Sequence, residues 1–167
     1  MESIRQAVET VSERLARDPE AGARPDTTAV AVRDHGLRFR ITGPNGEVFS
    51  DMAESVGGGA SAPTPGWLMR AALAACDAST VVIEAAREGI ELTDVTVTVE
   101  SESDSRGALG VDDSIPPGPL SVRVRIELAA TNASADQLRG LAERVQARSV
   151  VGDALARPIS VTTEIVA

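Results

Sequence analysis

The sequence predicts an α+β protein built from antiparallel strands and a long central helix. Two groups of segments alternate apolar and polar residues with the period of two that strands show. An alanine-rich segment between these groups has the three-and-four spacing of a helix. The strands come in runs rather than in strict alternation with helices, which favours α+β over a parallel α/β fold. A chain of 167 residues suffices for one domain with its own core.

The first 26 residues are expected to form an extension that precedes a domain of residues 27–167. An amphipathic helix over residues 3–17 is predicted by apolar residues three and four positions apart, namely Ile4, Ala7, Val8, Val11 and Leu15. A linker containing Gly, Pro and charged residues follows at 21–26. Three strands then open the domain, over 27–33, 37–42 and 47–51, and Asn45-Gly46 is a strong signal for the tight turn between the last two.

A long helix is expected from Pro65, capped by Thr64, to Glu88, where Gly89 provides a stop. Its many alanines allow neighbouring elements to approach closely. After this helix, two strands are expected over 92–102 and around 122–128, with a loop over 103–119 between them. A helix over 134–148 follows, and Ser134 and Gln137 form its capping box. The chain is then expected to make a turn over 150–155 and a last strand that contains Ile159, Val161 and Ile165.

The composition excludes several classes of function. With 25 acidic residues against 16 basic ones the net charge is -9, which disfavours nucleic acid and anionic membranes as partners. Every basic residue is arginine, so Schiff-base chemistry on lysine is excluded. One cysteine and one histidine cannot form a Cys/His zinc site, and no metal or other cofactor is expected. The N-terminus carries charges throughout and has no apolar leader segment, so a cytoplasmic protein is expected.

Cys76 is the one side chain with intrinsic redox chemistry, and it lies on the apolar stripe of the long helix. Two interpretations are open. A lone cysteine in this position is commonly a buried, inert core residue. A reactive thiolate in the middle of a helix needs an arginine brought from elsewhere, and Arg33, Arg38 and Arg40 on the opening strands are candidates. The single histidine, His35, is expected to be a solvated turn residue.

The segment Pro63–Ile90, PTPGWLMRAALAACDASTVVIEAAREGI, resembles the central helix of the OsmC/Ohr family, and Thr93–Val99 resembles the family's next strand. The resemblance extends in element order over residues 27–167. It implies an OsmC-like fold, with antiparallel sheets packed around the long helix, in an intertwined homodimer with a site at the dimer interface. It also implies a thiol peroxidase in the oxidative stress response, in which a thiolate at the position of Cys76 attacks an organic hydroperoxide.

The sequence departs from this family at three positions. Where the family has a second cysteine that forms a disulfide, the segment SVVGDAL places Ser149. Where the family has a glutamate that holds an activating arginine, TPGWL places Gly66. Asp77 replaces an apolar residue beside the thiol, and a carboxylate there disfavours the thiolate. The segment RDHGLR resembles the family's arginine turn, with Arg33 the best match for the activating arginine and Arg38 the second.

Three functions follow from these observations. The first is a one-cysteine peroxidase that uses Cys76 and Arg33, takes a small apolar hydroperoxide and relies on an external thiol or dithiol as reductant. The second is a catalytically degenerate dimer that binds a small apolar ligand in a pocket near Trp67, Met69 and Thr80, with Arg38 and Ser149 also at the site. The third is a dimeric protein that binds a protein partner, suggested by the additional helix over 3–17.

Overall fold

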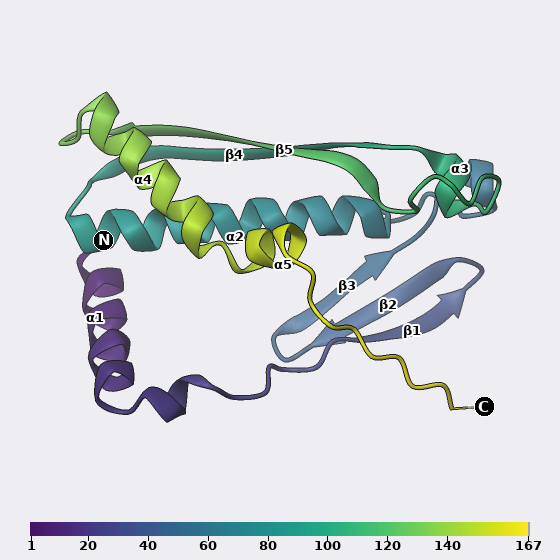
Figure 1. Ribbon diagram of the computed structural model, residues 1–167, viewed down its shortest axis with the longest axis horizontal. Coiled ribbons are helices and arrows are strands. Elements are labelled where there is room, and N and C mark those ends of the chain that lie inside the picture. Colours follow the sequence, from purple (N-terminus) through teal and green to yellow (C-terminus); the bar gives the residue numbers. More distant parts are fainter. Residues whose placement is uncertain (167) are drawn as a thin grey trace. The chain divides into compact units, whose positions relative to one another are not determined.

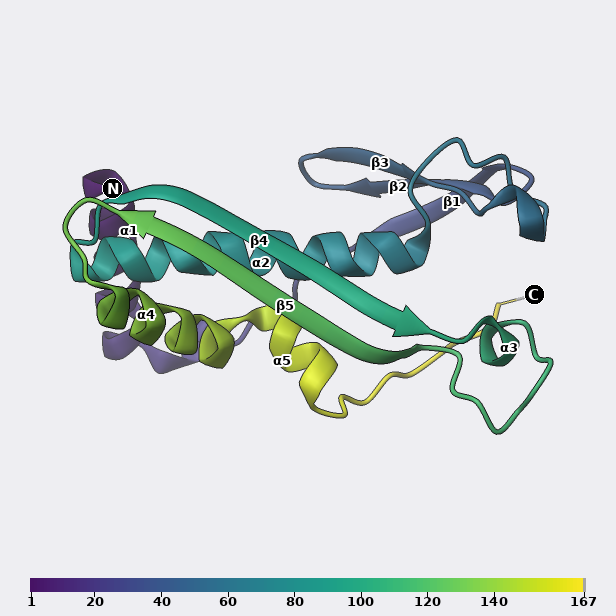
Figure 2. The same ribbon diagram turned by 90° about the horizontal axis from the view of Figure 1, so that it is seen from above.

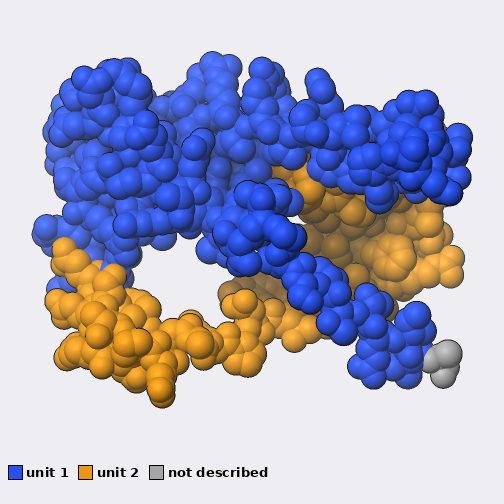
Figure 3. Space-filling model, viewed as in Figure 1, with its two compact units in different colours: residues 1–8, 72–167 blue, residues 9–71 orange. Residues whose placement is uncertain are grey.

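The computed structural model describes residues 1–166, which divide into two compact units (Figure 3). One unit contains residues 1–8 and the chain from Ala72 onward, and the other contains residues 9–71. Helix α1 (Glu2–Arg17) and helix α2 (Pro65–Glu88) each cross from one unit to the other along the chain. The helix expected over 3–17 is confirmed as α1, and none of its residues is buried.

The unit of residues 9–71 is built on an antiparallel three-stranded sheet in the order β1-β2-β3. Its strands are β1 (Val30–His35), β2 (Arg38–Gly43) and β3 (Gly46–Ser50). The predicted turn is confirmed, because Gly43 pairs with Gly46 and Gly46 has a φ of 148° that favours glycine. Short 3-10 helices lie at Pro19–Gly22 and Glu54–Val56.

The other unit places a long two-stranded ribbon along α2 (Figures 1 and 2). Strands β4 (Leu92–Ser103) and β5 (Pro119–Ala130) pair in antiparallel register, with Val97 opposite Ile126. The short helix α3 (Ser105–Ala108) lies in the loop between them. Helix α4 (Ala135–Arg148) lies beside α2, and its predicted Ser134/Gln137 capping box is present. The buried core joins α2, the ribbon and α4 and consists of Val81, Ala85, Ile90, Leu141 and Val145.

Helix α2 begins and ends where the sequence predicts. The Thr64 hydroxyl accepts a hydrogen bond from the Trp67 N–H at 3.2 Å, and Gly89 stops the helix with a φ of 68°. By length and apolar composition α2 would pass for a membrane span. It nevertheless buries the carboxylates of Asp77 and Glu84, and Glu84 pairs with Arg87 and Arg148, as in the core helix of a folded domain.

Two expectations for the C-terminal region are wrong. Residues 150–155 belong to helix α5 (Val150–Ala156), because Ser149 caps it by accepting a hydrogen bond from the Gly152 N–H at 3.0 Å. The predicted last strand is absent from the described part of the chain, where residues 158–166 pair with no other strand. Its alternating side chains Ile159, Val161 and Ile165 are exposed, because alternation alone does not supply a neighbouring strand edge.

Candidate functional site

Cys76 and Ser149 are neighbours in space although 73 positions separate them in sequence. Cys76 lies in the middle of α2 and is half-buried, whereas Ser149 is buried at the junction of α4 and α5. The Ser149 hydroxyl donates to the Cys76 sulfur across 3.6 Å, while its oxygen accepts the Gly152 N–H. The structure therefore brings together two of the residues selected from the sequence.

Thr80 lies one helical turn after Cys76, and its hydroxyl donates to the Cys76 carbonyl at 2.8 Å. This hydroxyl is engaged by the helix backbone. Trp67 is half-exposed in the first turn of α2, next to an open hollow lined by Ala62, Pro63, Thr64 and Arg70, and Met69 is half-buried. Neither contributes to the pocket that Ser149 lines in the unit that contains Cys76.

That pocket has a volume of about 520 Å³ and lies between α2, β5, α4 and α5. Ser149 is the one residue of the sequence-predicted set that lines it. Asp77, adjacent to Cys76 in sequence, also lines it and is buried. Most of the remaining wall is aliphatic, with Leu73 from α2, Leu120 and Val124 from β5, and Leu155 from α5.

Arg38 is held by three groups within the unit of residues 9–71. Its Nε donates to Asp34 at 3.1 Å, and its Nη1 donates to the Ser61 hydroxyl at 2.7 Å. Its guanidinium lies over the ring of Phe49, 4.1 Å from the centroid. With 20% of its side chain exposed, Arg38 is fixed in one orientation by two polar partners and a ring.

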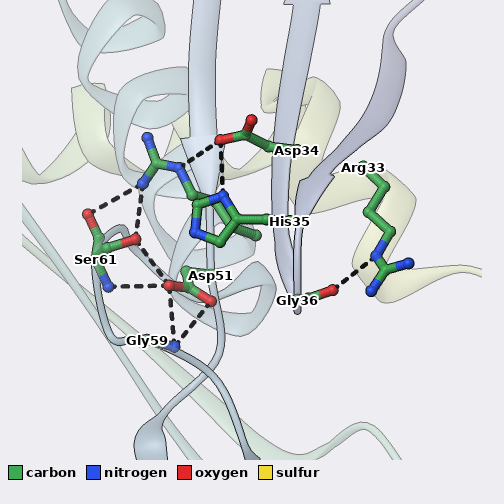
Figure 4. Close-up of polar contacts among 8 residues, drawn as sticks. Arg33, Asp34, His35, Gly36, Asp51, Gly59 and Ser61 are labelled. Atoms are coloured by element: carbon green, nitrogen blue, oxygen red, sulfur yellow. Dashed lines mark hydrogen bonds and ion pairs between the residues drawn. The ribbon is translucent and has the colours of Figure 1, made fainter.

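Arg33 is in a different environment. Its Nε donates to the Gly36 carbonyl at 2.9 Å across the β1–β2 turn, and the residue is exposed (Figure 4). His35 lies beside Asp34 with 74% of its side chain exposed, in agreement with its expected role as a solvated turn residue. Among the two candidate arginines, Arg38 is therefore the one with a restrained side chain.

Asp51 organises the loop that carries Ser61. Its buried carboxylate accepts hydrogen bonds from the N–H groups of Met52, Gly59 and Ser61 and from the Ser61 hydroxyl at 2.8 Å (Figure 4). The bonds from Ser61, first from its N–H and then from its hydroxyl, lower the pKa of Asp51 from 3.8 to about 2. Because the Ser61 hydroxyl also accepts from Arg38, Asp51 supports the arginine through one intermediate residue. Sequence reasoning missed this cluster, although Asp51 before the Gly57–Gly59 loop is a turn signal that could have indicated it.

We expect Asp51→Asn to remove a pH-dependent part of the stability. A folded-state pKa below the unfolded value gives stability that is present above about pH 4 and is lost as the pH falls toward 2. The difference in unfolding free energy between wild type and Asp51→Asn should therefore shrink across this window, as measured by urea unfolding at several pH values. A difference that stays constant from pH 5 to pH 2.5 would contradict the role given to this carboxylate.

The chain is similar in sequence to one protein family and in fold to several solved structures. The family model for OsmC-like proteins matches residues 57–164. Among solved structures, an OsmC-like protein of unknown function from Vibrio cholerae superimposes with a TM-score of 0.66 at 10% identity, covering 80% of this chain and 95% of that one. The OsmC-like protein from Mycoplasma pneumoniae gives a TM-score of 0.63 at 16% identity, covering 80% and 87%.

A third similar structure is an organic hydroperoxide resistance protein OsmC from Legionella pneumophila, with a TM-score of 0.59 at 20% identity and coverage of 80% of this chain and 91% of that one. No curated protein sequence matches the chain. Within residues 1–166, no group of three or more His, Cys, Asp or Glu side chains is placed to hold a metal ion.

Proposed function

The chain belongs to the OsmC-like protein family, and from this premise we propose that it is a one-cysteine thiol peroxidase that reduces small apolar organic hydroperoxides. The contact between Cys76 and Ser149 is the observation that carries the proposal. The resemblance aligns these two positions with the family's pair of cysteines, and in the fold they lie 3.6 Å apart, sulfur to oxygen. The arrangement keeps a nucleophile and a hydrogen-bond donor where the family keeps two thiols.

In the proposed reaction the Cys76 thiolate attacks one peroxide oxygen. A sulfur–oxygen bond forms, the oxygen–oxygen bond breaks, and the leaving alkoxide takes a proton to become an alcohol. Cys76 is left as a sulfenic acid. Ser149 cannot condense with it to a disulfide, so an external thiol attacks the sulfenic sulfur and releases water. A second thiol then displaces Cys76 as a thiol and leaves as the oxidised disulfide of the reductant.

We assign the activating arginine to Arg38 rather than to Arg33. Arg38 suits this role because Asp34, Ser61 and Phe49 restrain it, whereas the exposed Arg33 bonds only across its own turn among the described residues. The partners of Arg38 compensate for Gly66, which stands where the family has its arginine-holding glutamate.

We expect Arg38→Ala to slow the reaction of Cys76 with cumene hydroperoxide by at least about tenfold, since an arginine that stabilises developing charge contributes on the order of 1.4 kcal/mol or more. Stopped-flow measurement of the reduced protein under pseudo-first-order conditions gives the rate constant. Arg33→Ala is the matched control and should change it by less than about threefold. The assignment is wrong if Arg33→Ala has the larger effect.

The assembly we propose is a homodimer. Six of the 24 residues of α2 are buried, although the helix is apolar enough to pass for a membrane span. The apolar residues Ile159, Val161 and Ile165 are exposed in an extended segment. A second copy of the chain would cover such surface, which monomeric proteins rarely leave open. Sedimentation equilibrium at micromolar concentration tests this, and a monomer that retains peroxidase activity would contradict it.

The proposal as a whole is tested by intact mass and free-thiol measurement after stoichiometric cumene hydroperoxide, with hydrogen peroxide and Cys76→Ser for comparison. A gain of one oxygen that is faster with the organic peroxide, is reversed by a small thiol and is absent in Cys76→Ser supports it. A thiol that reacts no faster than free cysteine would overturn it.

A further inference from the structure

The pocket between α2, β5, α4 and α5 contains a carboxylate that the protein leaves unpaired. Asp77 is 3% exposed, and its Oδ1 makes no hydrogen bond with any residue in the described part of the chain. A buried carboxylate without a partner is costly, because neither water nor a protein donor replaces its lost hydration. Asp77 lines a cavity of about 520 Å³, a volume typical of sites for small molecules.

The other polar groups of the pocket do not satisfy Asp77. The Ser149 hydroxyl is already committed to the Cys76 sulfur and the Gly152 N–H. Gln146 is exposed. No arginine is among the described residues that line the pocket, so its walls supply no guanidinium donor to Asp77. The Asp77 carboxylate therefore requires a hydrogen-bond donor from a bound ligand.

The residues that line the pocket indicate the chemistry of the rest of this ligand. Leu73, Leu120, Val122, Val124 and Leu155 are aliphatic, and their side chains offer contact to a hydrocarbon chain but no hydrogen bonds. An ammonium group supplies several N–H donors and the charge that is complementary to a carboxylate, whereas a neutral alcohol supplies one weaker donor. The net charge of -9 also favours approach of a cation.

We propose that this pocket binds a small amphipathic amine, with the protonated ammonium donating to Asp77 Oδ1 and the hydrocarbon chain packed against the aliphatic wall. This site shares Ser149 with the proposed peroxidase site, but amine binding needs no reaction at Cys76.

Isothermal titration calorimetry with octylamine, octanol and octanoate separates the head group from the chain. For the reduced full-length protein we expect octylamine to bind at least about tenfold more tightly than octanol, and octanoate to give no measurable binding. Asp77→Asn preserves the size of the side chain and should bring octylamine to the affinity of octanol. Asp153→Asn, on α5 outside the pocket walls, is the matched control and should bind octylamine like the wild type.

A second variant keeps the test valid if Asp77→Asn alters the fold. Leu155→Trp fills the apolar end of the pocket and should weaken octylamine and octanol alike, with circular dichroism unchanged. The proposal is overturned if wild type binds octylamine no better than octanol, which is also the result expected if a second copy of the chain covers the pocket. It is equally overturned if Asp77→Asn retains the preference for the amine. Since no peroxide is present, an unreactive Cys76 does not affect either outcome.

Discussion

Ser149→Cys is expected to form an intramolecular disulfide with Cys76 when the reduced variant meets one equivalent of organic hydroperoxide. The side chain at 149 already contacts the Cys76 sulfur at 3.6 Å, so a thiol there is within reach of the sulfenic acid. Condensation forms the sulfur–sulfur bond and releases water. Because the bond closes a loop of 73 residues, the oxidised variant should be more stable than its reduced form by about 4 kcal/mol.

Free-thiol counting and non-reducing peptide mapping measure this outcome, and urea unfolding with and without dithiothreitol measures the stability. Wild type should instead accumulate sulfenic acid, because a hydroxyl cannot complete the exchange. Ser114→Cys, in the loop between α3 and β5, is the matched control and should form no intramolecular disulfide. If Ser149→Cys retained both thiols after the oxidation of Cys76, the two positions would not serve as a redox pair.

The elements of this fold that sequence predicts best are those determined by local chemistry. Thr64-Pro65 and Gly89 fix both ends of α2, and Asn45-Gly46 fixes the β2–β3 turn, because caps and tight turns are satisfied by residues next to them in the chain. The Ser134/Gln137 capping box is local in the same sense. Alternation also predicts β4 and β5 as strands, whereas their antiparallel pairing is given by the structure.

The features that sequence missed depend on partners far away in the chain. Residues 158–166 have the alternation of a strand, but no strand edge is available to them within the described chain. Asp51 looks like a loop residue until Gly59 and Ser61 fold back to donate to its carboxylate. The sequence singles out Asp77 beside Cys76, but only the packing of the fold shows that its carboxylate is buried. The resemblance led to Cys76 and Ser149, and the fold brought them together.

The largest loss of stability from a single conservative substitution is expected for Glu84→Gln. Glu84 lies on the buried face of α2, 3% exposed, and its carboxylate pairs with Arg87 at 3.0 Å and with Arg148 of α4. Glutamine at position 84 removes the negative charge that pairs with the guanidinium groups of Arg87 and Arg148. Breaking a buried pair commonly costs 3–5 kcal/mol, and we expect about 2–3 kcal/mol here because the arginine side chains are 36% and 50% exposed.

Glu88→Gln provides a matched control on the same helix. Glu88 pairs with Arg144 of α4 one turn further along, but its side chain is 36% exposed, and an exposed pair contributes at most about 1 kcal/mol. Thermal unfolding should show a drop in Tm of roughly 5–10 °C for Glu84→Gln and of about 3 °C or less for Glu88→Gln. Equal drops would mean that burial does not strengthen the Glu84 pairs.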